Sequence, residues 1–182
     1  QLSRELAIKL YKRNPKELNK VPNMTLRRRV DQLFPATRLE NGFPELGNKD
    51  GSEAIPLAFS PDYKGDRVFA LMAGITGMLE AAYNSKKEIF FLDELDQQKL
   101  YNSARNLESI AWHLNNRKDE YGQLYILSNG ISDEGIGNYS YERILGKMIS
   151  LQDMMATIIA DTTNRTINRV VHGAASMTFF PI

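Results

Sequence analysis

The stretch VFALMAGITGMLEAAY (68–83) decides the fold of this chain. Fifteen of its residues are apolar, small or threonine, and its one charged residue is Glu80. Large side chains form one helical stripe (Val68, Leu71, Met72, Ile75, Met78 and Leu79) and small ones a second (Ala70, Ala73, Gly74, Gly77 and Ala81). Glycine costs about 0.8–1.0 kcal/mol relative to alanine inside a helix, so Gly74 and Gly77 need a compensating contact. The pattern predicts an interior helix whose flat face lies against another helix. The alternative is a pocket floor, left open where side chains are missing.

The same stretch does not have the pattern of a membrane span. A helix needs about 20 consecutive apolar residues to cross the hydrocarbon core, whereas this run has 16 with Glu80 among them. Charged residues also flank it, with Asp66 and Arg67 before it and Lys86 and Lys87 after it. We therefore expect a helix packed in water, in a chain without a transmembrane span.

Two short helices precede this stretch. Apolar residues recur at helical spacing over 2–14, and Pro15 stops that helix. A second helix is predicted from Thr25, as N-cap, to Phe34, with Pro35 ending it. Residues 35–59 are punctuated by proline and glycine and predict an irregular segment, either a linker or a stretch that wraps the body. The domain prediction is a basic helical arm with its linker over 1–59 and a body over 60–182.

The charge of the chain is asymmetric. Residues 1–38 carry a net charge of +7, and the remainder carries −6. A basic arm of this kind engages either an anionic partner or the acidic body of its own chain.

The body is predicted to contain three long helices. The first begins with Ser60 as N-cap and runs to about Asn84. The apolar segment EIFFL (88–92) is either a strand or a connector, since a run of five apolar residues does not distinguish the two. The second helix is predicted from the N-cap Asp93 to Gly122. Its seam is Leu100, Ala104, Leu107, Ala111 and Leu114.

The last helix has the clearest pattern. It is predicted to begin at the N-cap Ser140 and to reach about His172, some 45 Å in length. Its seam repeats at spacings of 4, 3, 4, 3 and 4: Ile144, Met148, Leu151, Met155, Ile158 and Thr162. Before it, residues 123–139 predict a structured loop, and the terminal MTFFPI (177–182) is apolar enough to dock on the body. The fold class is all-α, an antiparallel bundle of three or more long helices with a basic N-terminal helical arm.

Residues 65–114 resemble a family of uncharacterised exported proteins and lipoproteins from Gram-negative bacteria. The resemblance rests on GITGM (74–78) and LDQQKLYNSARNLE (95–108) and covers about a third of the chain. It implies a secreted helical protein, periplasmic or lipid-anchored at the outer membrane, and it brings no activity with it. On this basis we expect Gln1 to lie shortly after a processing site; whether a signal peptide or a lipid-modified cysteine precedes it is open.

Few residues have the spacing of a catalytic or metal site. The chain has no cysteine and two histidines, His113 and His172, without partners at metal-binding spacing. Asp93, Glu94 and Asp96 suit a helix N-terminus. Asp133 and Glu134 lie in a glycine-rich loop, 128–138, for which cation binding is an open alternative, although EF-hand spacing is absent. We predict no catalytic, cofactor or metal residues and no cofactor.

The basic cluster TLRRRVDQL (25–33) indicates which kinds of partner the chain could bind. On a helix Arg27, Arg28 and Arg29 fan over about 200° instead of forming one stripe, and no reading helix accompanies them. Nucleic acid is therefore disfavoured. A solvated face or a contact with the acidic body is the preferred interpretation, and an anionic membrane surface or envelope polymer is the alternative.

These features predict a non-enzymatic envelope protein that acts through a protein or an anionic envelope component, with peripheral or lipid-anchored membrane association as an option. The alternative is a binder of a small apolar ligand or lipid, held between the Gly74/Gly77 helix and the methionine-rich last helix (Met148, Met154 and Met155). A third hypothesis is an enzyme that uses loop carboxylates or His113. The sequence does not fix the biological role, the partner or the oligomeric state.

Overall fold

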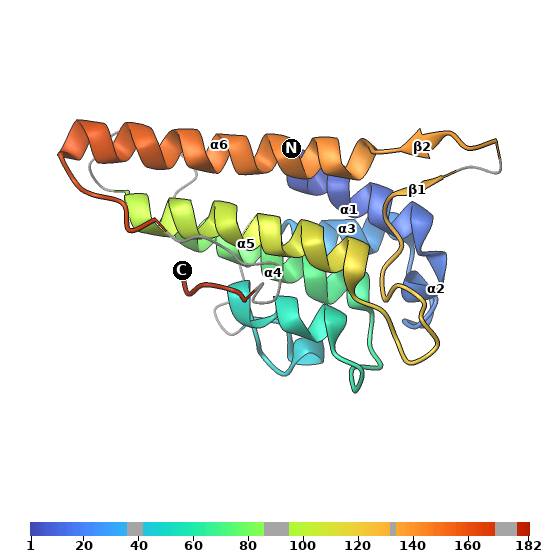
Figure 1. Cartoon of the computed structure of the whole chain (residues 1–182). Coiled ribbons are helices and arrows are strands. Elements are labelled where there is room, and N and C mark those ends of the chain that lie inside the picture. The colour runs from blue at the N-terminus through green and yellow to red at the C-terminus, as the bar shows by residue number, and fades with distance from the viewer. Residues whose placement is uncertain (36–41, 86–94, 132–133, 170–177) are drawn as a thin grey trace.

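The computed structural model describes residues 1–35, 42–85, 95–131, 134–169 and 178–182, and this part of the chain is mostly helical (Figure 1). The α-helices are α1 (Leu2–Arg13), α2 (Pro15–Leu18), α3 (Leu26–Leu33), α4 (Arg67–Ala82), α5 (Gln97–Asn116) and α6 (Ser140–Thr163). Three 3-10 helices, η1 (Pro44–Leu46), η2 (Gly51–Glu53) and η3 (Ile55–Phe59), precede α4, and β1 (Gly130–Ile131) and β2 (Gly137–Asn138) precede α6.

The helix formed by the opening stretch, α4, is the centre of the core. It is buried along most of its length, and α1, α3, α5, η2 and η3 pack around it. Its N-cap is Asp66, whose Oδ1 accepts a hydrogen bond from the Phe69 amide at 2.9 Å. The prediction that Ser60 caps this helix was wrong, because Ser60 ends η3, and the helix ends at Ala82 instead of Asn84.

The predicted close approach at the glycines is confirmed at Gly74. A Cβ added there would lie 2.5 Å from Cγ1 and 2.9 Å from the backbone nitrogen of Ile55, and 3.1 Å from the carbonyl oxygen of Gly51. The expectation that a helix of the bundle supplies this contact was wrong. The contact comes instead from the segment that holds η2 and η3, and this segment was predicted to be irregular.

That segment is ordered because its apolar residues alternate with turn-forming ones. Pro44 and Pro56 lie in the first turns of η1 and η3, where a preset φ favours helical geometry. Leu46, Ala54, Ile55, Ala58 and Phe59 are all buried in the main core.

Helices α1 and α3 contribute to the same core. Leu6 and Leu10 of α1 and Val30 and Leu33 of α3 are buried with the residues of α4. The predicted N-cap Thr25 is confirmed, since its hydroxyl accepts a hydrogen bond from the Arg28 amide at 3.3 Å.

Helix α5 is shorter at its end than the sequence predicts. It begins after the N-cap Asp96, whose Oδ1 accepts hydrogen bonds from the Gln98 and Lys99 amides at 2.7 and 3.2 Å. The prediction that Asp93 caps this helix was wrong, because Asp96 does; Asp93 itself, with Glu94 and the segment 88–92, lies outside the described residues. The helix ends at Asn116 because Arg117 is extended, so the predicted end at Gly122 was wrong.

Helix α6 differs from the prediction at both ends. Ser140 is its first residue and Tyr139 its N-cap. It ends at Thr163, because Asn164 has a φ of +54°, in the left-handed region that commonly ends helices. The predicted continuation was therefore wrong, and its end point His172 lies outside the described residues.

The predicted seam of α6 is only partly buried. Ile144 and Met148 are buried, but 44% of Leu151 and 39% of Ile158 are exposed. A strict heptad drifts by about 20° per repeat on a straight helix, so positions beyond the second turn leave the core. Residues at the 3.6 period, Gln152, Ala156 and Ile159, are buried in their place.

The connection before α6 contains a short antiparallel pair of strands, in which Gly130 lies opposite Asn138 and Ile131 opposite Gly137. The predicted structured loop over 123–139 therefore includes a two-residue strand pair. At the C-terminus Phe179 and Ile182 pack on the core, and Phe180 exchanges two backbone hydrogen bonds with the Asn106 amide group, at 2.8 and 2.6 Å. The predicted docking of this end is confirmed for 178–182. No helix in the described part of the chain is long and apolar enough to cross a membrane.

Candidate functional site

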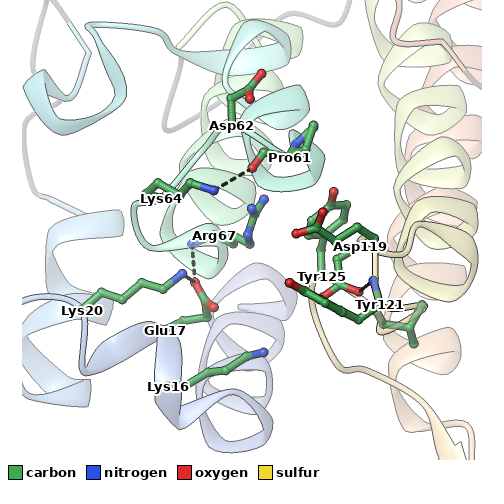
Figure 2. Close-up of a pocket in the computed structure, with 12 residues that line it drawn as sticks. Lys16, Glu17, Lys20, Pro61, Asp62, Lys64, Arg67, Asp119, Tyr121 and Tyr125 are labelled. Atoms are coloured by element: carbon green, nitrogen blue, oxygen red, sulfur yellow. Dashed lines mark hydrogen bonds and ion pairs between the residues drawn. The ribbon is translucent and has the colours of Figure 1, made fainter.

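A polar cleft lies between the N-terminal helices and the loop after α5 (Figure 2). It has a volume of about 490 Å³. One wall comes from α2 and the turn before α4, and the other comes from the loop 117–125. The lining residues are Lys16, Glu17, Lys20, Pro61, Asp62, Lys64, Arg67, Asp119, Glu120, Tyr121, Leu124 and Tyr125.

A buried carboxylate joins α2 to α4 at the base of this cleft. Glu17 is 2% exposed, and its Oε2 accepts hydrogen bonds from Lys20 Nζ at 2.7 Å and from the Arg67 amide at 2.8 Å. The Arg67 amide is in the first turn of α4, where backbone donors lack helical partners and negative charge is stabilised. Glu17 therefore holds α2 against the start of α4 and keeps Lys20 beside the cleft.

The guanidinium of Arg67 is also committed to the protein backbone. It donates hydrogen bonds to the carbonyl oxygens of Ala58, Ser60 and Tyr63 at 3.0, 2.8 and 2.8 Å. It lies over the Tyr125 ring, 4.4 Å from the ring centre, an arrangement that stabilises a cation. Arg67 thus links the turn before α4 with the opposite wall.

The second wall is a tight loop stabilised by Asp119. Its Oδ1 accepts hydrogen bonds from the Tyr121 and Gln123 amides, both at 2.9 Å. This leaves Glu120 exposed and Tyr121 80% exposed beside the cleft. The chain beyond this loop is held by Asn14, whose amide group exchanges two 2.8 Å hydrogen bonds with the backbone of Leu127.

Next to the cleft, a buried ion network fixes α1, α3 and η1 on α4. Asp66 Oδ2 accepts hydrogen bonds from the Tyr11 hydroxyl at 2.9 Å and from Arg29 Nε at 3.0 Å. The other end of the Arg29 guanidinium binds both oxygens of Glu45, at 2.8 and 2.7 Å. Arg29 is 1% exposed and lies 3.5 Å from the centre of the Phe69 ring. Burial raises the pKa of Asp66 and the pKa of Tyr11 above their ordinary values, and the Asp66 charge raises the Tyr11 pKa further.

Sequence reasoning did not find the residues of the cleft. Glu17 looks like an ordinary first-turn acid in a proline-led helix, and Arg67 looks like a charged flank of the apolar stretch. What places them together is the packing of α2 on α4, for which the sequence gives no periodic signal. Of the arginines in 25–33, Arg29 alone is buried, and it contacts Asp66 of the body and Glu45 of the predicted arm segment, whereas Arg27 and Arg28 are exposed.

The residues weighed for other chemistry lie elsewhere. Among the described residues no three histidine or carboxylate side chains gather in a way that would hold a metal ion. Asp96 caps α5, Glu134 is exposed, and Asp133 is outside the described residues. The flat side of α4 at Gly74 is filled by Ile55, while Met154 is 52% exposed on α6.

His113 is a buried residue of α5. Its Nδ1 lies 2.7 Å from the Ser109 carbonyl oxygen, and its ring lies 5.0 and 5.2 Å from the Phe59 and Phe179 rings, centre to centre. Burial lowers the pKa of His113 below its ordinary value of 6.5. The neutral ring is therefore the form that packs between η3 and the C-terminus.

This burial predicts a pH dependence of stability. Between the lowered folded pKa of His113 and the ordinary value, the unfolded chain binds more protons than the folded one. The free energy of unfolding should therefore fall as the pH is lowered through about 6.5. His113→Gln should flatten this decline in the free energy of unfolding. Urea unfolding at pH 7.5, 6.5 and 5.5 measures it, and an unchanged profile in His113→Gln would exclude this residue as the cause.

Comparison of the chain with protein families, with curated proteins and with solved structures finds no match.

Proposed function

We propose that this chain is a non-enzymatic binding protein of the bacterial envelope, and that its cleft holds a small polar group with an anionic end and a cationic end. The observation that carries the proposal is the opposition of the two walls. Lys16, Lys20 and Lys64 come from α2, the residues just after it and the turn before α4, a turn that also holds Asp62, whereas Asp119 and Glu120 come from the loop after α5.

The charges on the two walls suit a dipolar group. Lys16, Lys20 and Lys64 are all exposed and lie on one side in Figure 2, whereas Asp119, Tyr121 and Tyr125 lie on the other. Lysine ammonium groups bind phosphate or carboxylate as point charges, and the exposed Tyr121 ring with the nearby carboxylates attracts an ammonium group. The basic arm predicted from the sequence supplies two of the three lysines.

The roles of the cleft residues favour binding over catalysis. Glu17 and Asp119 accept backbone hydrogen bonds that hold the start of α4 and the loop. Arg67 donates three bonds to backbone carbonyls. A general acid or base must be free to exchange a proton with a substrate, and these groups are engaged in shaping the walls.

The proposal also places the protein in the periplasm or at the outer membrane, lipid-anchored, because 65–114 resemble exported proteins and lipoproteins. We further propose that the long helices form an antiparallel bundle. The packing of α5 along α6 supports this arrangement (Figure 1). Cell fractionation with mass determination of the native N-terminus tests the location. A cytosolic protein that retains its initiator methionine would contradict it.

O-phosphoethanolamine is a suitable probe because it carries both charges, and inorganic phosphate and ethanolamine carry one each. We expect it to bind at least fivefold more tightly than either half, by isothermal titration calorimetry. Lys16→Gln and Glu120→Gln should each weaken it by about five- to tenfold, since one charged contact contributes about 1–1.4 kcal/mol.

Lys12→Gln is the matched control, because Lys12 is an exposed lysine of α1 outside the cleft. It should leave the affinity unchanged. If inorganic phosphate and O-phosphoethanolamine bound with equal affinity, the cleft would be a simple anion site and the proposed dipolar site would be wrong. Equal losses in Lys12→Gln and Lys16→Gln would remove the cleft as the binding site.

A further inference from the structure

The outer face of α6 carries an apolar stripe in the middle of the helix. Leu151, Met154 and Ile158 are 44%, 52% and 39% exposed. Their spacing of three and four residues places them on one side of the helix. Figure 1 shows α6 along one edge of the molecule, with α1 and α5 both on its inner side.

Opposite charges flank this stripe. Arg143 and Lys147 are exposed in the N-terminal half of α6, and Asp161 is exposed near its C-terminal end. At 100° per residue, all three lie within about 40° of Met154 around the helix axis. A second copy of the helix in antiparallel orientation would therefore bring basic residues against Asp161 at both ends.

We propose that two copies of this chain pair through the outer face of α6, antiparallel, about a two-fold axis that is level with residue 152 along the helix. In this register Arg143 lies opposite Asp161 and Ser150 lies opposite Met154, because the members of each pair are equidistant from residue 152 and lie on nearly the same side of the helix. The same patch on both subunits then contacts itself, as in the isologous interfaces of most homodimers.

The surface has a hollow where this register needs one. A depression of about 490 Å³ is lined by Leu2, Gly146, Lys147, Ser150 and Leu151. A Cβ at Gly146 would meet no atom within 4 Å, so the contacts within one chain do not require this glycine. The small residue at 150 leaves room for the Met154 side chain of the second copy, as a knob fits into a hole.

The interface is small, which predicts a reversible dimer. Helix α6 has 24 residues, so the contact is at most about 36 Å long. A contact confined to one helix of this length is expected to give a weak or transient complex. The inference does not rest on the proposed function, because no cleft residue lies in α6.

A charge-swap cycle tests the register. By sedimentation equilibrium of the full chain, Arg143→Asp and Asp161→Arg should each weaken dimerisation at least tenfold, because each dimer contains the pair twice. The double variant should return to within about threefold of the wild type, since it restores the pair with reversed signs. Circular dichroism shows whether each variant is folded.

A second variant tests the apolar centre. Met154→Asp should abolish the dimer. Ile131 is also an exposed apolar residue, at 72%, but it lies outside α6, so Ile131→Asp should leave the dimer unchanged. A wild-type chain that stays monomeric up to millimolar concentration overturns the proposal. A Met154→Asp variant that still dimerises also overturns it. So does a double variant whose loss of dimer affinity equals the product of the losses in the two single variants.

Discussion

Replacing Arg29 with methionine is expected to lower the free energy of unfolding by about 3–5 kcal/mol. Asp66 is fully buried, and Arg29 Nε is the cationic donor that it has at 3.0 Å. Methionine fills part of the space but leaves the carboxylate of Asp66 without that partner. A buried charge that loses its partner is far more costly than a lost surface ion pair.

Arg28→Met is the matched control for this variant. Arg28 precedes Arg29 in α3 and is exposed, so its replacement should change stability by less than about 0.5 kcal/mol. Urea unfolding followed by circular dichroism measures both variants. Equal stability of Arg28→Met and Arg29→Met would show that the buried network does not hold α3 on α4.

The central part of the fold was predictable because its signal is local. The apolar run at 68–83 and the glycine within it indicate a buried helix that another backbone approaches, and Gly74 confirms the approach. The partner was not predictable, because η2 and η3 are short turns whose burial depends on long-range packing. A 3-10 turn of three residues has too few positions to show a hydrophobic period.

The ends of the helices show where sequence patterns fail. In α6 the apolar spacing continues past Thr163, but Asn164 adopts a left-handed conformation that ends the helix. The heptad seam of α6 also predicted Leu151 and Ile158 as core residues, and the structure exposes both. A spacing indicates which residues share a face, but it does not say whether that face is turned to the core or to a partner.

The candidate site was not predictable for a related reason. Its parts come from 16–20, 61–67 and 119–125, three segments that are far apart in the sequence. Each has an ordinary local interpretation, as a helix start, a turn and a polar loop. Only tertiary packing reveals that Glu17 is buried against the Arg67 amide.

Gly74→Ala is expected to destabilise the chain by about 1–3 kcal/mol, as overpacking of a core does. Alanine has a higher helix propensity than glycine by about 0.8–1.0 kcal/mol, so propensity alone predicts the opposite sign. The added methyl group would lie 2.9 Å from the backbone nitrogen of Ile55. A backbone atom cannot rotate away, so η3 has to shift from α4.

The direct test of the central claim compares Gly74→Ala with Gly146→Ala. Gly146 is also inside a helix, but no atom lies within 4 Å of the position of its Cβ, so alanine there should stabilise the chain by up to about 1 kcal/mol. Urea unfolding at a concentration low enough to keep the chain monomeric gives both values. Opposite signs, with a loss for Gly74→Ala and a gain for Gly146→Ala, are the predicted result. A gain at both positions would contradict the account, because Gly74 would then not be required by the packing of residues 51–55 on α4.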